Sequence, residues 1–173
     1  MIIECVGGDP VEVAGISLVA ARLDGLNLHR ALLDGQNLQR ASCIKTDFRG
    51  AFLSDANLDD TVLTGASLIT AFLMRTSLRR AVLDGGRAIA CQFDEGDLTD
   101  ASLEAVDIGN ASFVKARLHG ARLLCQRIET ASFTGATYDE KTLWPPGFDP
   151  VAAGALLEAP PTPNLSQVSP PNP

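Results

Sequence analysis

A period of five residues organises most of this chain. Every fifth residue from Val13 to Tyr138 is apolar, over 26 consecutive positions without an exception. An amphipathic helix places apolar residues at spacings of three and four, and a half-buried strand places them at a spacing of two. A sustained spacing of five fits neither element. It indicates an internal repeat, and such repeats are typical of solenoids, in which each unit buries its apolar residues against the neighbouring units.

A second register accompanies the first. The residue two positions before each large apolar residue is mostly alanine, the residue between them is usually Asn, Asp or Ser, and the two that follow are mostly polar, charged or glycine. Units such as Ala56-Asn57-Leu58-Asp59-Asp60, Ala66-Ser67-Leu68 and Ala111-Ser112-Phe113 resemble the A(D/N)LXX unit of the pentapeptide repeat family, over about three quarters of the chain. The resemblance implies an all-β fold, a right-handed quadrilateral parallel β-helix.

The number of units in one coil follows from the interval at which similar or opposite residues recur. Phe93, Phe113 and Phe133 are 20 residues apart in the inward register. Two sets of charges alternate in sign at the same interval and predict ion-pair ladders: Arg40, Asp60, Arg80 and Asp100, and Asp55, Arg75, Glu95 and Lys115. Four units therefore make one coil, and the 26 units make six and a half coils. At roughly 4.8 Å per stacked strand, the rod is about 30 Å long.

The ends of the chain differ from the repeats. We expect an N-terminal cap of a short strand and a turn over residues 1–10, the solenoid over 11–140, a C-terminal cap over 141–158 and a Pro-rich disordered tail over 159–173. Trp144 and Phe148 are the large aromatic residues beyond the repeats, and we expect them to cover the end of the apolar column. Residues 151–157 are compatible with one or two helical turns, because Pro150 is allowed at the first position of a helix.

Two places within the repeats depart from the pattern. Gln36 and Gln126 occupy the small inward register and are predicted to be buried amides bonded to backbone carbonyls. The unit Gly86-Arg87-Ala88 has the smallest centre and follows another glycine, so we expect a local dent there.

Charge and cysteine content narrow the function classes. The formal net charge is −7 and the pI is near 4.7, which argues against direct binding to nucleic acid or to an anionic membrane. The N-terminal residues do not have the pattern of a signal peptide, and no apolar stretch approaches the length of a membrane span, so we expect a cytoplasmic protein. The four cysteines include no CxxC spacing: Cys43 and Cys91 fall in inward registers and are expected to pack as small hydrophobes, and Cys5 and Cys125 lie far apart in the sequence.

Residues suited to catalysis are few. The two histidines, His29 and His119, lie on different sides of a 20-residue coil with four coils between them, and the carboxylates are scattered over outward registers. The sequence contains no glycine-rich phosphate loop and no nucleophile elbow. A close-packed column of Leu and Phe leaves no cleft for a substrate. We therefore predict a non-enzyme, with no catalytic residues, no cofactor and no metal site.

Two non-enzymatic functions are open at this stage. The first is a structural or interaction scaffold that offers rigid faces to an unknown protein partner. The second follows from the resemblance, because some pentapeptide repeat proteins mimic DNA and bind type II topoisomerases such as DNA gyrase, which confers fluoroquinolone resistance or toxin immunity. Its candidate surface is an acidic face of Asp59, Asp60, Asp97 and Asp100. Arginines interrupt this face, so we rank mimicry second: Arg40, Arg79, Arg80 and Arg117.

The sharpest candidate for a contact surface is a row of apolar residues in outward registers. Leu32, Phe52 and Phe72 recur at intervals of 20, with Met74 beside them. Exposed apolar patches often mark contacts. The row is either an interface, with a side-by-side homodimer as the simplest outcome, or a set of side chains that pack along their own sheet.

Overall fold

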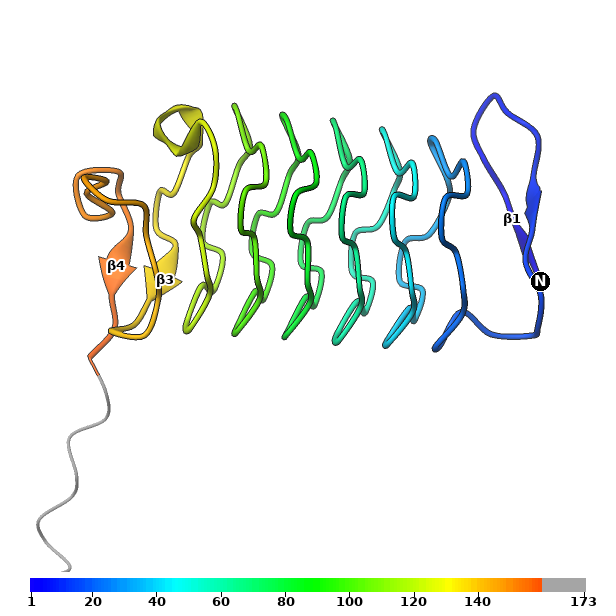
Figure 1. The fold of residues 1–173 in the computed structure, drawn as a ribbon, viewed down its shortest axis with the longest axis horizontal. Helices are drawn as coiled ribbons and strands as arrows, with labels where there is room; N and C mark the ends of the chain where they lie inside the picture. Colours follow the sequence, from blue (N-terminus) through cyan, green and yellow to red (C-terminus); the bar gives the residue numbers. More distant parts are fainter. Residues whose placement is uncertain (160–173) are drawn as a thin grey trace, which may run out of the picture.

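The chain folds into a rod of stacked rectangular coils. Its computed structural model describes residues 1–159, so the predicted Pro-rich tail falls, apart from its first residue, outside the described residues. Figure 1 shows a hairpin at the N-terminal end of the stack and a second short pair of strands at the other end. At the N-terminus β1 (Ile2–Ile3) pairs antiparallel with β2 (Val11–Glu12). At the other end β3 (Thr137–Tyr138) pairs in parallel with β4 (Leu156–Leu157).

Parallel bridges between residues 20 apart confirm the predicted coil of four units and the four-sided parallel β-helix. Each of the four sides can be represented by one bridge: Phe52 with Phe72, Asn57 with Ser77, Val62 with Val82, and Ser67 with Arg87. We name each side after the first residue of its bridge, for example the Phe52 side. In each pair the two residues hold equivalent positions of successive coils. Each side therefore presents one outward side chain per coil in a straight row.

Each five-residue unit uses its backbone donors in a fixed way. In the unit around Leu53, the N–H groups of Leu53 and Asp55 donate to the next coil, to the carbonyls of Phe72 at 2.8 Å and Met74 at 2.9 Å. The N–H of Phe52 donates back to Ala31 in the previous coil, at 2.9 Å. Only the N–H of the residue after the central leucine lacks a backbone acceptor, and this donor becomes important for the acidic residues discussed below.

The corners require a left-handed backbone. Asp55, in the second corner position of its unit, has φ 60°, and the same position has a positive φ in coil after coil. Glycine adopts this conformation without strain, and Asn and Asp adopt it more readily than other residues, which favours the glycines and aspartates that hold this second position.

The inward side chains form one continuous column. Phe93, Phe113 and Phe133 are fully buried, and their rings stack with centroids 4.8 Å and 5.1 Å apart. The small inward register is mostly alanine. Where it holds threonine, the buried hydroxyl donates to a backbone carbonyl, as from Thr61 to Leu38 at 3.0 Å.

The predicted dent at Gly86-Arg87-Ala88 was wrong. Arg87 bridges both Ser67 and Asp107 in the regular way, and Ala88 is fully buried. A Cβ atom on Gly86 would lie 2.8 Å from the Ala66 carbonyl oxygen, so the glycine allows a close backbone approach and keeps the stack regular.

The irregular part of the solenoid is residues 124–130. Asp107 bridges Gln126, where the regular interval would bring Arg127, and the chain then makes a single 3₁₀ turn, η1 (Ile128–Thr130). Because one residue is missing from this unit, Cys125 takes the inward corner, and its Sγ lies 3.3 Å from the Leu103 carbonyl. Burial raises the pKa of the Cys125 thiol to about 12.

The prediction that Gln36 and Gln126 are buried amides was wrong, because both side chains are exposed. Gln126 is displaced by the missing residue, and its Nε2 donates to the Ala105 carbonyl at 3.3 Å. Gln36 turns to solvent, where its amide avoids the cost of desolvation in an apolar column.

The C-terminal cap closes the column with aromatic rings. Trp144 packs against Phe133 and Tyr138, with ring centroids 5.3 Å and 5.4 Å apart, and Phe148 lies 5.7 Å from Phe133. This confirms that Trp144 and Phe148 cover the end of the column.

The cap contains no helix at residues 151–157, contrary to the expectation. Gly154 has φ 89°, which ends a turn, and the chain then continues as β4. The N–H groups of Leu156 and Glu158 donate to Ala136 and Tyr138, at 2.7 Å and 2.8 Å, so the segment adds one more rung to the stack. Within residues 1–159, no helix is long and apolar enough to cross a membrane.

Candidate interaction surfaces

The structure brings the four predicted apolar residues together on one side of the rod. We call Leu32, Phe52, Phe72 and Met74 the Phe52 row. The first three lie on successive rungs, and the rings of Phe52 and Phe72 stack with centroids 5.3 Å apart and planes 9° from parallel. Leu32 is 48% exposed, whereas the other three residues are half-buried. The phenylalanines thus pack along their own sheet and still present their outer edges to solvent.

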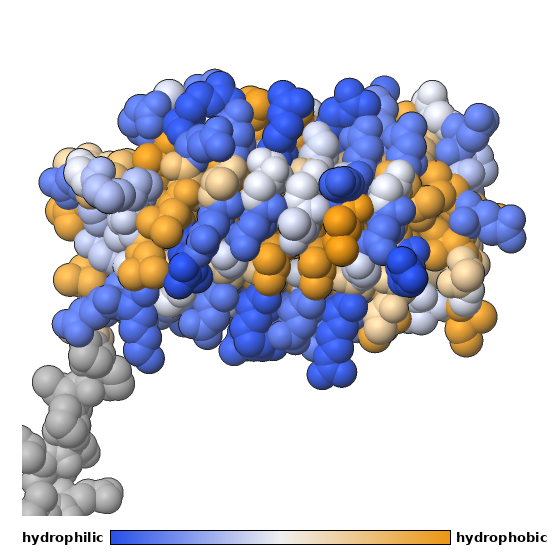
Figure 2. All heavy atoms as spheres, in the orientation of Figure 1, coloured by the Kyte–Doolittle hydropathy of each residue, from blue (hydrophilic) through white to orange (hydrophobic). Residues whose placement is uncertain are grey.

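The row continues into a hollow at the N-terminal end of the rod. This hollow has a volume of about 180 Å³, and its lining includes Met1, Ile2 and Leu32. The N–H of Leu32 donates to the Glu4 carbonyl at 2.8 Å, which holds the segment after β1 beside the row. In Figure 2, hydrophobic side chains lie in the middle of the face shown, interspersed with hydrophilic ones, and at its two ends, and hydrophilic side chains predominate along the two long edges.

A column of alternating charges follows one edge of the Phe52 row. It occupies the second corner position after the Phe52 side and consists of Asp55, Arg75, Glu95 and Lys115. Asp55 and Arg75 form a two-point ion pair, at 2.8 Å and 2.7 Å. Hydrogen bonds from Arg75 lower the pKa of the Asp55 carboxyl. Each of the two predicted ladders thus contains one ion pair, the second being Asp60 with Arg80 at 2.7 Å.

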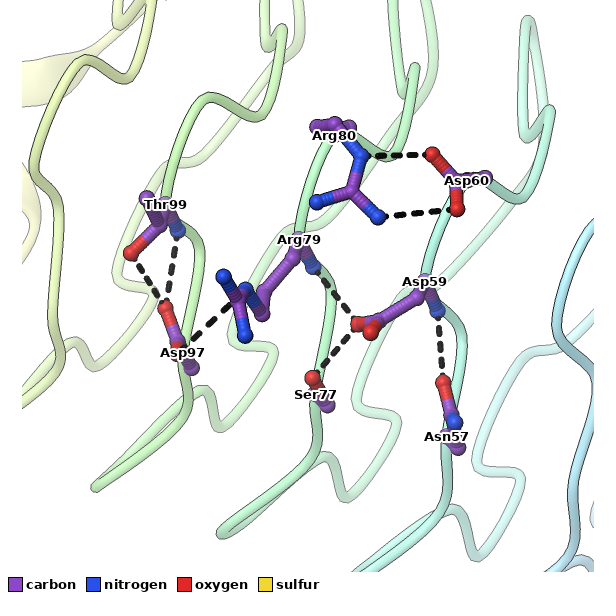
Figure 3. Close-up of polar contacts among 8 residues, drawn as sticks. All are labelled: Asn57, Asp59, Asp60, Ser77, Arg79, Arg80, Asp97 and Thr99. Atoms are coloured by element: carbon purple, nitrogen blue, oxygen red, sulfur yellow. Dashed lines mark hydrogen bonds and ion pairs between the residues drawn. The ribbon is translucent and has the colours of Figure 1, made fainter.

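The four residues of the predicted acidic face lie on one side of the rod, in two coils separated by the coil of Ser77, and most of them are bound internally (Figure 3). Asp60 forms its ion pair with Arg80, and Asp97 accepts hydrogen bonds from the N–H and hydroxyl of Thr99, at 3.0 Å and 2.5 Å. Asp59 accepts hydrogen bonds from the next coil. The carboxylate of the fourth residue, Asp100, lies against Gly120. A Cβ atom added to Gly120 would be 2.2 Å from the carboxylate oxygen of Asp100.

Asp59 shows why the repeat contains so many carboxylates. Its Oδ1 accepts from the Arg79 N–H at 3.1 Å and from the Ser77 hydroxyl at 2.5 Å. The Arg79 N–H is the donor that has no backbone acceptor in its unit. Four further aspartates bind the same N–H one coil later: Asp24, Asp34, Asp84 and Asp94, which accept from Ile44, Ser54, Glu104 and Val114.

In other units a side chain of the same unit satisfies this donor, as Asn57 Oδ1 does for the Asp59 N–H at 2.9 Å. This structural role of the acids was not predicted from the sequence. Its signal is an Asp directly after the central residue with a Ser 18 residues later, as at Asp59 and Ser77.

These contacts predict how stability changes with pH. Hydrogen bonds from arginine lower the folded-state pKa of Asp47, Asp55 and Asp60 from the ordinary value of 3.8. A lowered pKa contributes stability that is fully present above the unfolded value and is lost as the pH falls through the folded value. We therefore expect the free energy of unfolding to be level between about pH 7 and 5 and to fall below about pH 4.

Chemical denaturation at a series of pH values tests this, with Asp55→Asn and Asp60→Asn giving a shallower fall. A protein that becomes more stable in acid would contradict it, because that behaviour indicates unneutralised carboxylates that repel one another.

The histidines lie apart in the structure as well. His119 Nε2 lies 3.1 Å from Glu158 Oε2, next to β4, whereas His29 is near the N-terminal end. Among residues 1–159, no three His, Cys, Asp or Glu side chains come together in the way that metal ligands do.

The repeat matches a known protein family. Eight copies of it match the family model "Pentapeptide repeats", over residues 16–55 and 56–93. The chain belongs to the pentapeptide repeat family. Comparison with curated protein sequences gave no significant match.

Solved structures of this family resemble the chain. Trypsin-treated QnrB1, described as a plasmid-mediated fluoroquinolone resistance protein, aligns with a TM-score of 0.58 and 16% identity, covering 82% of this chain and 77% of that one. A pentapeptide repeat protein from Nostoc PCC 7120 is 32% identical over 65% of this chain and 84% of its own, with a TM-score of 0.29. Rfr23 from the cyanobacterium Cyanothece 51142 is 24% identical over 71% and 87%, with a TM-score of 0.29. At its identity, the likeness to QnrB1 shows the fold alone.

Proposed function

We propose that this protein is a non-enzymatic scaffold that binds another protein through the Phe52 row. The observation that carries the proposal is the stacked pair Phe52 and Phe72, half-exposed beside Leu32 and Met74. Exposed apolar groups in a continuous row are typical of contact surfaces, and aromatic residues and methionine are enriched there.

The rod suits this role because the row is held in place before binding. The outward residue of each rung is bonded to the coil before it, as Phe52 is to Ala31 and Phe72 to Ala51, both at 2.9 Å. A surface that is already ordered loses little conformational entropy on binding, so a small contact area gives more affinity than it would on a mobile loop.

Affinity capture with matched variants tests the proposal. We expect the wild-type protein to retain a specific partner from an extract of its source cells and the Phe52→Ser/Phe72→Ser variant to lose it. The control is Val62→Ser/Val82→Ser, which changes two half-buried residues on the corresponding rungs of the Val62 side. Capture of the same proteins by all three forms would overturn the role of the row.

A second candidate function is a DNA mimic that binds a type II topoisomerase such as DNA gyrase. The net charge of −7 favours it, and so does the shared fold with QnrB1. The internal use of Asp59, Asp60 and Asp97 weighs against it, since a mimic needs carboxylates that are free to meet basic groups. We therefore keep it second, and the cytoplasmic location stays a prediction.

A DNA supercoiling assay separates the two candidates. Purified protein is titrated into gyrase, beside an acidic control protein of equal net charge. We expect no inhibition beyond that of the control up to about 100 µM, because non-specific acidity affects both proteins alike. Inhibition at low micromolar concentration by this protein alone would place the DNA mimic first and direct attention to the acidic face.

A further inference from the structure

We infer that the Phe52 row binds a second copy of this chain, with the two rods side by side and antiparallel. The inference rests on the proposed function, because it takes the Phe52 row as the contact surface, and it adds the identity of the partner and the register of the contact. The charges along the edge of the row favour this arrangement.

The column of Asp55, Arg75, Glu95 and Lys115 alternates in sign from coil to coil. A twofold axis perpendicular to the rods reverses the order of the coils and brings this corner of one copy against the same corner of the other. If the axis lies midway between two coils, the column of one copy is shifted by an odd number of coils against the column of the other. Each charged residue that faces a charged residue of the second copy then faces one of opposite sign. The alternating column is thus complementary to itself, and such complementarity favours one register over others.

The apolar residues select the position of that axis. With the axis midway between the coils of Phe52 and Phe72, Phe52 faces Phe72 of the second copy, and Asp55 faces Arg75 of the second copy. Met74 then faces Ser54 of the second copy, a large side chain against a small one. The stacked rings therefore form the centre of the contact, and the charges lie at its rim.

Other arrangements lose one of these features. An axis through the Phe52 coil would set Asp55 against Asp55 of the second copy. Parallel rods would bring the charged corner against the preceding corner, whose equivalent positions from the second coil onward are uncharged: Gly50, Thr70, Ala90 and Asn110. The antiparallel register midway between coils is the arrangement that uses both the rings and the charges.

The contact is small. The four successive rungs of Leu32, Phe52, Phe72 and Gln92 are separated by three intervals of roughly 4.8 Å and so span about 14 Å along the rod. A contact this short buries less surface than the roughly 1,200 Å² of a stable interface. We therefore expect a weak dimer, with a dissociation constant on the order of 100 µM.

Sedimentation velocity and translational diffusion measure this association. We expect the average mass to rise from 18.2 kDa towards twice that value as the concentration rises. Phe52→Ser/Phe72→Ser should weaken dimerisation about tenfold or more, because it removes the aromatic centre of the contact. Val62→Ser/Val82→Ser should leave it unchanged.

Charge exchange tests the register. Asp55→Arg alone and Arg75→Asp alone each set like charges against each other in a homodimer, so each variant should be monomeric. An equimolar mixture of the two restores opposite signs at both contacts and should dimerise again. The ion pair within each chain stays broken in the mixture, so recovery reports only the contact between copies.

Asp60 and Arg80 provide the matched control. They form the equivalent two-point pair at the next corner, at 2.7 Å and 2.9 Å. Asp60→Arg, Arg80→Asp and their mixture should all dimerise as the wild type does.

The outcomes separate this inference from the proposed function. A monomer at about 1 mM, well above the expected dissociation constant, overturns self-association. If that monomer still captures a different protein through the row, the scaffold role stands. A dimer that survives the row variant, or a mixture of charge variants that stays monomeric, overturns the contact described above.

Discussion

Replacing Phe113 by alanine is expected to lower the free energy of unfolding by about 3–5 kcal/mol, the usual cost of truncating a buried aromatic residue. Phe113 is fully buried and is the middle of three stacked rings, with centroids 4.8 Å from Phe93 and 5.1 Å from Phe133. Alanine would leave a cavity between coils that cannot collapse, because backbone hydrogen bonds fix the spacing of the rungs.

Chemical denaturation followed by circular dichroism measures this loss. The matched control is Phe52→Ala, which removes the same side chain from a stack that is half-exposed and faces outward. We expect it to cost about 1–2 kcal/mol, since less apolar area returns to water. Equal losses for the two variants would contradict the inward column as the main source of stability.

Replacing Trp144 by alanine is expected to open the C-terminal end of the rod at a cost of about 2–4 kcal/mol, somewhat less than for a fully buried ring. Trp144 contacts Phe133, Tyr138 and Phe148, with centroids 5.3 Å to 5.4 Å away. Without it, Phe133 keeps only the contact with Phe148 at the end of the column. Because each coil of a solenoid contacts only its neighbours, unfolding should spread inward from that end.

Hydrogen exchange locates the effect of Trp144→Ala. We expect protection to fall for the N–H of Lys115, which donates to Thr134 at 3.0 Å, and to stay high for the N–H of Leu33, which donates to Phe52 at 2.8 Å. Uniform loss along the rod would show that it unfolds as one unit.

Trp144→Phe is the control for this prediction. The indole Nε1 is buried without a hydrogen-bond acceptor among residues 1–159, so Trp144 stabilises the cap through packing. Phenylalanine keeps most of this packing and removes the unsatisfied donor, and we expect it to be close to wild type.

The acidic residues illustrate how composition can mislead about function. A net charge of −7 points to a surface that repels nucleic acid or imitates it. In the structure, Asp59 and its equivalents accept hydrogen bonds from backbone N–H groups, and Asp55 and Asp60 pair with arginines. Much of the negative charge thus serves the fold, whereas the apolar row keeps part of its surface exposed to solvent.

The sequence by itself determined the coil, the inward column and the aromatic plug. Each five-residue unit obeys the same steric rule. The inward positions of Phe93, Phe113 and Phe133 therefore follow from the sequence of their own units, without reference to the neighbouring coils. It also placed Leu32, Phe52 and Phe72 in one row, because an interval of four units returns to the same side of the rod.

The tertiary structure alone decided the features that depend on a partner one coil away. The binding of Arg79 N–H by Asp59 and the rung added by Leu156 both join donors and acceptors that are distant in sequence and adjacent in the stack. The shift that brings Cys125 inward in place of Gln126 is likewise set by the Asp107 rung below it. The local sequence pattern cannot predict these pairings. A backbone N–H bonds to the acceptor that the adjacent coil places next to it, and the sequence of its own unit does not identify that acceptor.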